Sequence, residues 1–156
     1  MDPKDFMRRA IALSRCNVDD GSGGPFGAVI VKDGVIVGEG RNQVIASNDP
    51  TAHAEIMAIR DACARLGTYS LEGCEIYASC EPCPMCLGAI LWARIDRLYY
   101  ASDRGDAAAA GFSDAHLHEE VALPVQDRRL PTARLLADEA RTVFAAWAAK
   151  PDKSLY

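Results

Sequence analysis

The sequence predicts an α/β protein in which helices pack against both faces of a mixed sheet. Segments of helical and strand character alternate as far as about residue 101, in the order α-β-β-α-β-α-β, and such alternation favours parallel strand pairings covered by helices. An Asp33-Gly34 pair separates two β-branched runs, which is typical of a tight hairpin and makes one pairing antiparallel. Hydrophobic residues make up 49% and charged residues 25% of the chain, as in globular domains.

A helix is expected near the N-terminus, followed by the hairpin. Asp2 suits the N-cap of this helix and Pro3 its first position, and apolar residues follow at helical spacing. The segment 21–25 ends the helix, because its glycines and proline favour a turn. Short apolar runs at 26–31 and 35–37 are expected to pair as the two strands of the hairpin.

The rest of the chain predicts further helices and strands within one domain. A helix is expected from about residue 51 to 66, since alanines recur there at helical spacing and Gly67 suits its C-terminal cap. The other elements expected up to residue 101 are strands at 76–78 and 98–101, a turn at 79–82 and a helix at 84–93. Farther along, segments 107–110, 114–121 and 137–149 favour helix, whereas 42–50 and 124–131 favour loop. No repeat or long linker divides residues 1–156, so a single domain is expected.

Composition excludes several classes of function. The chain carries 17 Lys and Arg against 22 Asp and Glu, a net charge of −5, which gives no general attraction to nucleic acid. Its longest apolar runs are about seven residues, whereas a membrane-spanning helix needs ~20. No secretory signal is recognisable either, so a cytoplasmic location is expected. The six cysteines are then expected to stay reduced and to serve in metal binding, catalysis or burial.

Two clusters carry residues suited to metal chemistry. His53 and Glu55 stand at the start of one predicted helix, and Cys83 and Cys86 at the start of another. Cysteines three residues apart lie on the same side of a helical turn, and the positive end of the helix favours thiolates. One imidazole and two thiolates suit Zn²⁺ and leave a fourth position open for a catalytic water. Glu55 then stands close enough to act as the base.

This order of residues is the pattern of zinc nucleobase deaminases, His-x-Glu followed by Pro-Cys-x-x-Cys. The chain resembles the cytidine deaminase-like superfamily, and within it most closely the bacterial guanine deaminases. The segments that carry the resemblance are 23–31, 47–55, 79–90 and 106–112. The first three are shared with tRNA adenosine deaminases and cytosine deaminases, whereas the Gly111-Phe112 region and the terminal Tyr156 favour guanine. The likeness is close from about residue 6 to 114 and loose beyond.

The resemblance implies a fold and a reaction. The fold is a three-layer α/β/α sandwich around a mixed five-stranded sheet. His53, Cys83 and Cys86 hold one zinc ion per chain and its catalytic water. Glu55 removes a proton from this water and delivers protons to the ring and to the leaving amine. Guanine would thereby become xanthine and ammonia.

The resemblance also implies substrate contacts and an oligomeric state. Asn42 is expected to donate a hydrogen bond to the purine base, Phe26 to stack on its ring and Asp114 to read its edge. Tyr156 is similar to a terminal aromatic residue that closes the partner subunit's site in a domain-swapped homodimer. The exchanged segment would be about 137–156.

Several alternatives stay open at the level of sequence. A tRNA adenosine deaminase or a cytosine deaminase would share the metal site, although a tRNA-binding surface should show clustered Lys and Arg. A structural zinc module without activity would need a fourth ligand, for which Cys80 is available. A redox Cys-x-x-Cys pair would not require the His-x-Glu cluster. His116 and His118 lie in a polar stretch and are expected to be solvated.

Overall fold

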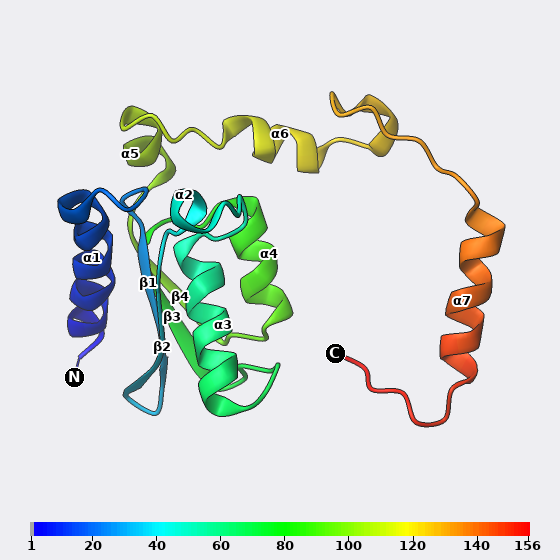
Figure 1. The fold of residues 1–156 in the computed structure, drawn as a ribbon, viewed down its shortest axis with the longest axis horizontal. Coiled ribbons are helices and arrows are strands. Elements are labelled where there is room, and N and C mark those ends of the chain that lie inside the picture. The colour runs from blue at the N-terminus through cyan, green and yellow to red at the C-terminus, as the bar shows by residue number, and fades with distance from the viewer. Residues whose placement is uncertain (1) are drawn as a thin grey trace. The chain divides into compact units, whose positions relative to one another are not determined.

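A computed structural model describes residues 2–156, and its centre is a mixed four-stranded sheet (Figure 1). The strands are β1 (Gly27–Lys32), β2 (Val35–Arg41), β3 (Cys74–Cys80) and β4 (Arg97–Ser102). They lie in the order β2-β1-β3-β4, in which β1 pairs antiparallel with β2 and β3, and β3 pairs parallel with β4. The predicted hairpin is confirmed, because Asp33 and Gly34 both adopt the positive φ of a tight two-residue turn.

Helices cover both faces of the sheet, so the predicted three layers are confirmed (Figure 1). The helices that the structure describes are α1 (Pro3–Asp20), α2 (Val44–Ser47), α3 (Ala54–Leu66), α4 (Pro84–Trp92), α5 (Arg104–Ala109), α6 (Ala115–Ala122) and α7 (Ala137–Ala149), with a 3₁₀ turn at Val125–Asp127. Val29 and Val31 of β1 pack with the α1 side of the sheet, whereas Ala28 and Ile30 pack with α3 on the other. This alternation follows from the two-residue period of a strand.

Strand β2 continues beyond residue 37, where the sequence predicts its end. It does so through two glycines, Gly38 and Gly40, that let α3 approach closely. Glycine disfavours a strand interior, so the sequence prediction ended the strand at residue 37. In the structure, a Cβ atom on Gly38 would lie 2.6 Å from the backbone oxygen of Ala58, and one on Gly40 would collide with the backbone of Ala54. The two glycines therefore let α3 lie directly against β2.

Two other expectations about the sheet are wrong. The turn predicted at 79–82 starts later, because β3 continues through Ser79 and Cys80; the Ser79 hydroxyl accepts a hydrogen bond from the Gly27 N–H. The fifth strand implied by the resemblance is also missing from the sheet that residues 2–156 form. Directly after β4, Asp103 and Asp106 form a reciprocal capping box, which starts helix α5.

The chain divides into two compact units, one ending at Leu117 and the other comprising His118–Tyr156. The second unit contains the 3₁₀ turn and α7, and no residue of α7 is buried within the chain. None of the helices in residues 2–156 is long and apolar enough to cross a membrane.

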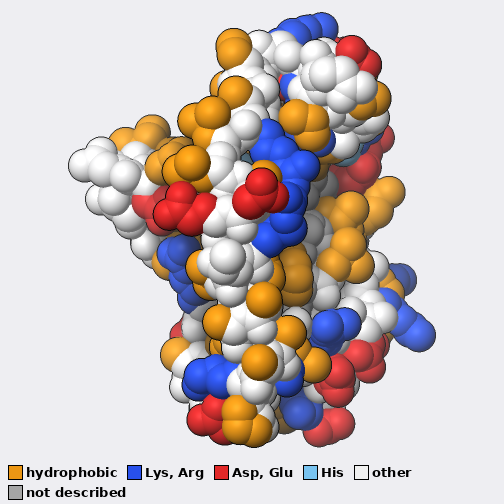
Figure 2. All heavy atoms as spheres, turned by 90° about the vertical axis from the view of Figure 1, so that its right-hand side faces the viewer, with side chains coloured by type: hydrophobic (Ala, Val, Ile, Leu, Met, Phe, Trp, Pro, Cys, Tyr) orange, Lys and Arg blue, Asp and Glu red, His pale blue; other side chains and the backbone are white. Residues whose placement is uncertain are grey.

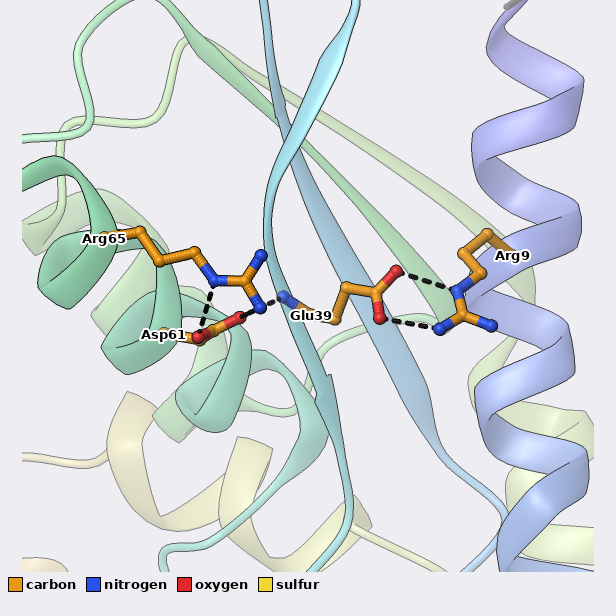
Figure 3. Close-up of polar contacts among 4 residues, drawn as sticks. All are labelled: Arg9, Glu39, Asp61 and Arg65. Atoms are coloured by element: carbon orange, nitrogen blue, oxygen red, sulfur yellow. Dashed lines mark hydrogen bonds and ion pairs between the residues drawn. The ribbon is translucent and has the colours of Figure 1, made fainter.

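An ion-pair network joins both helical layers to the edge of the sheet (Figure 3). Arg9 of α1 donates two hydrogen bonds of 2.7 Å to the Glu39 carboxylate on β2. The backbone N–H of Glu39 donates to Asp61 of α3, which also accepts from Arg65. Because β2 is an edge strand, this network occupies a backbone donor that would otherwise face solvent.

Replacing Glu39 by Gln is expected to lower the free energy of unfolding by about 1 kcal/mol near pH 7, as for a well-ordered, partly buried ion pair. The hydrogen bonds from Arg9 hold the pKa of Glu39 below its ordinary value of 4.5. The contribution of the pair is therefore present above that value and is lost as the pH falls through the native pKa. Urea titrations of both proteins at pH 7 and pH 3 should show the difference shrink at pH 3. Glu72→Gln at an exposed site serves as control, and an equal Glu39→Gln effect at both pH values would contradict the assignment.

Candidate active site

Two helix N-termini supply the side chains of the candidate metal site. His53 is the N-cap of α3, Cys83 is the N-cap of α4, and Cys86 lies in the first turn of α4. Neither His53 nor Cys83 uses its side chain to cap the helix backbone, although N-cap side chains commonly do so. The two side chains are thus available to each other and to a ligand.

The spacing of these three side chains fits a zinc ion. His53 Nδ1 lies 3.6 Å from Cys83 Sγ and 3.5 Å from Cys86 Sγ, and all three ligand atoms lie within 4.8 Å of one another. Zinc distances of about 2.0–2.1 Å to nitrogen and 2.3 Å to sulfur place tetrahedral ligand atoms roughly 3.5–3.8 Å apart. The predicted ligands are therefore already arranged as a tetrahedral site requires, with one position left open.

The electrostatics of the cluster favour a cation. Hydrogen bonding from the Cys86 thiol, and then from His53, lowers the pKa of Cys83 to about 4, which makes this side chain a thiolate at neutral pH. The pKa of Cys86 is raised because its thiol donates to that thiolate and is buried. The positive ends of both helix dipoles add to the stabilisation of negative charge here. A zinc ion would replace the shared proton.

Glu55, the predicted proton carrier, lies in the same pocket as the candidate metal site. It is the second residue of α3, only 7% exposed, and lines the same pocket as His53 and Cys83. Burial raises its pKa, so the carboxyl group holds a proton more readily than an exposed glutamate. A carboxyl group with a raised pKa is better suited than an exposed one to accept a proton and return it.

A pocket of about 360 Å³ brings the metal cluster together with three predicted substrate residues, Phe26, Asn42 and Asp114. Phe26 packs edge-to-face against Phe112, with ring centroids 5.1 Å apart. The side-chain oxygen of Asn42 accepts a hydrogen bond from the backbone N–H of Val44. The amide NH₂ group of Asn42 is then the part that can donate to a ligand.

The remaining residues that the sequence singled out do not join the cluster of three ligand atoms. Cys80 lines the pocket but does not join the three ligand atoms among the described residues; its thiol donates to the backbone oxygen of Asp103, and burial raises its pKa to about 11. His116 and His118 belong neither to the metal cluster nor to the lining of this pocket. Tyr156 belongs to the unit His118–Tyr156 and is 76% exposed within the chain.

The sequence prediction missed two residues that shape the pocket. Asn17 is 1% exposed, and its amide donates to the backbone oxygens of Gly24 and Asn42, so it ties together two loops of the pocket. A polar residue among the apolar positions of α1 was the available signal. Arg104 lines the pocket and pairs with Asp114. Nothing in the local sequence distinguishes it from a solvated arginine.

Comparison with known proteins agrees with this geometry. Residues 1–102 match the model of the cytidine and deoxycytidylate deaminase zinc-binding region. Guanine deaminase of Bacillus subtilis is 50% identical over the full length of both chains, and its crystal structure superimposes with a TM-score of 0.96, covering 100% of this chain and 99% of that one.

More distant relatives match less of the chain. A solved guanine deaminase from Nitrosomonas europaea is 34% identical, covers 73% of this chain and 66% of its own, and has a TM-score of 0.69. A tRNA-specific adenosine deaminase of Agrobacterium fabrum is 43% identical over 108 residues, which is 68% of this chain and 70% of the relative.

Replacing Cys83 by Ser is expected to remove bound zinc, because a hydroxyl does not ionise as the thiol does. The wild type should hold about one zinc per chain, the stoichiometry of a single tetrahedral site. Metal analysis by mass spectrometry of both purified proteins measures this. Cys80→Ser is the matched control and should retain the metal. If Cys80→Ser lost zinc as completely as Cys83→Ser, Cys80 would be a fourth ligand and the open position would not exist.

Proposed function

Because the chain belongs to the cytidine and deoxycytidylate deaminase family, we propose that it is a zinc-dependent aminohydrolase that converts guanine to xanthine and ammonia. The observation that carries this proposal is the 50% identity to a guanine deaminase along both full lengths. It is supported by the pocket that joins His53, Cys83 and Glu55.

His53, Cys83 and Cys86 would hold the zinc, which would supply the Lewis acidity that lowers the pKa of a catalytic water. Glu55 accepts the proton of this water as its oxygen bonds to the amino-bearing ring carbon. Glu55 passes this proton to a ring nitrogen, then takes the proton of the newly attached hydroxyl and gives it to the amine. The carbon–nitrogen bond breaks, ammonia leaves and a carbonyl remains. The buried carboxyl, with its raised pKa, keeps the transferred proton inside the site.

Three residues hold the purine in this proposal. Phe26 presents a ring that can stack on the base, and its edge contact with Phe112 fixes its position. Asn42 donates through its NH₂ group to an acceptor of the base. Asp114 accepts from N–H groups on the edge of the base, which guanine offers at its ring nitrogen and its amine.

A tRNA substrate is disfavoured because many arginines are paired with carboxylates of the same chain. Many arginines pair with carboxylates, such as Arg15 with Asp19, Arg41 with Asp20 and Arg60 with Asp49. On the face that Figure 2 presents, Lys and Arg side chains are accompanied by Asp and Glu. Phosphate-binding surfaces instead need cationic groups that are available to the backbone of the nucleic acid. A free base is therefore the better substrate.

The enzyme is proposed to act as one domain within a domain-swapped homodimer in the cytoplasm. The six cysteines are free thiols, as a reducing compartment requires. Large apolar side chains of the second unit are exposed within the chain: Val121, Val125, Leu130, Leu135, Leu136, Val143, Phe144 and Trp147. Orange side chains at the surface in Figure 2 illustrate such exposure. A second copy that exchanges residues 137–156 would cover them and bring Tyr156 to its partner's site.

A substrate panel tests the reaction. Ammonia release should be faster from guanine than from adenine, cytosine, cytidine or a tRNA anticodon stem-loop. Glu55→Gln should retain zinc and lose at least about 100-fold in kcat, since the proton transfer alone is removed. Glu72→Gln, an exposed site, is the matched control and should keep full activity. A more active base than guanine would overturn the specificity, and an active Glu55→Gln enzyme would overturn the mechanism.

Complementation tests the exchanged segment. Glu55→Gln removes proton transfer but keeps the terminal residue, whereas Tyr156→Ala keeps Glu55 but leaves its partner's site open. In a swapped dimer, unfolding and refolding the two variants together should restore about a quarter of wild-type activity, because half of the dimers then carry one complete site. Sedimentation should give twice the mass of one chain. If the mixture is no more active than its components, the exchange does not occur.

A further inference from the structure

Arg104 stands beside Asp114 in the wall of the pocket. Arg104 is the first residue of α5, and Asp114 lies between α5 and α6. Both line the pocket that contains His53 and Glu55. They also line a neighbouring pocket of about 400 Å³, so the two side chains stand between the two cavities.

The contact between them is an ion pair that leaves Asp114 well sheltered. Arg104 Nε lies 3.6 Å from Asp114 Oδ1, and the two side chains are 43% and 20% exposed. This distance is too long for a direct hydrogen bond. Arg104 therefore acts on the carboxylate mainly through its charge.

The other charged residues of the pocket explain why an arginine beside Asp114 is favourable. Glu55, Glu81 and Asp114 all line the pocket, and Arg104 is the only Lys or Arg among the described lining residues. A carboxylate that is withdrawn from water next to other carboxylates is costly unless a cation compensates it. Arg104 lies beside Asp114 and can compensate its charge.

The position of Arg104 at the start of α5 also indicates that its role is to pair with Asp114. The first turn of a helix carries partial positive charge and favours anions, so an arginine there is electrostatically unfavourable. The acidic residues of that turn, Asp103 and Asp106, already form the capping box with each other. Helix stability therefore does not account for an arginine at residue 104.

We infer that Arg104 is a positioning residue that holds the Asp114 carboxylate in the wall of the pocket. Through Asp114 it sets the preference for bases with N–H donors on their edge, such as guanine, over bases that lack them. This inference rests on the proposed function, because it assumes that Asp114 accepts hydrogen bonds from the base.

A double-mutant cycle tests the inference. Ammonia release from guanine is measured for the wild type, Arg104→Gln, Asp114→Asn and the double variant, each with zinc content and melting temperature determined. Arg104→Gln should raise the KM for guanine about tenfold and leave kcat nearly unchanged. In the Asp114→Asn background the same change should have no further effect. Arg104→Lys, which keeps the charge, should recover most of the affinity.

Arg15→Gln on α1 is the matched control, since it also breaks an exposed arginine–carboxylate pair and should leave KM unchanged. An Arg104→Gln effect that persists in the Asp114→Asn background would overturn the inference, because Arg104 would then contact the base itself. An unchanged KM, or a loss that Arg104→Lys does not recover, would overturn it too. These results leave the proposed function intact. A wild type that releases no ammonia from guanine overturns the proposed function and this inference together.

Discussion

The contact on which the site depends is that between α3 and the edge strand β2. It exists because residues 38 and 40 carry no side chain, and the alanines of α3 offer equally little bulk to the strand. A Cβ atom on Gly40 would collide with the backbone of Ala54, the residue between His53 and Glu55. The tightest point of the interface therefore fixes the first turn of α3. A shift of α3 away from β2 would move His53 and Glu55 together.

The second constraint is the meeting of two helix starts. A helix end normally satisfies its free N–H groups with a side-chain cap, yet His53 and Cys83 leave this interaction unmade. The loss in helix stability is compensated if the same side chains bind a cation, since metal binding to a preformed site stabilises the folded state. The positive helix ends favour the thiolates, which in turn attract the metal. The sheet holds the two helix starts in place, so the cluster is preorganised.

The sequence predicted the chemistry better than the architecture that supports it. His53, Glu55, Cys83 and Cys86 lie within a few residues of two helix starts, so local spacing suffices to bring each pair together. The extension of β2 was missed because glycines such as Gly38 and Gly40 are poor strand formers. They are needed at these positions because α3, which follows later in the chain, packs directly against them. The resemblance implies a fifth strand, whereas the sheet that residues 2–156 form has four.

Residues that act across loops were the hardest to predict, and this bears on how specificity is built. Asn17 and Arg104 have ordinary local surroundings, and only the folded chain shows that they hold Asn42 and Asp114. The metal cluster stands on two helices packed against the sheet, whereas Asn42 and Asp114 stand in connecting segments that need such support. Segments of this kind can change without disturbing the core. The choice of base can therefore vary while the metal site stays the same.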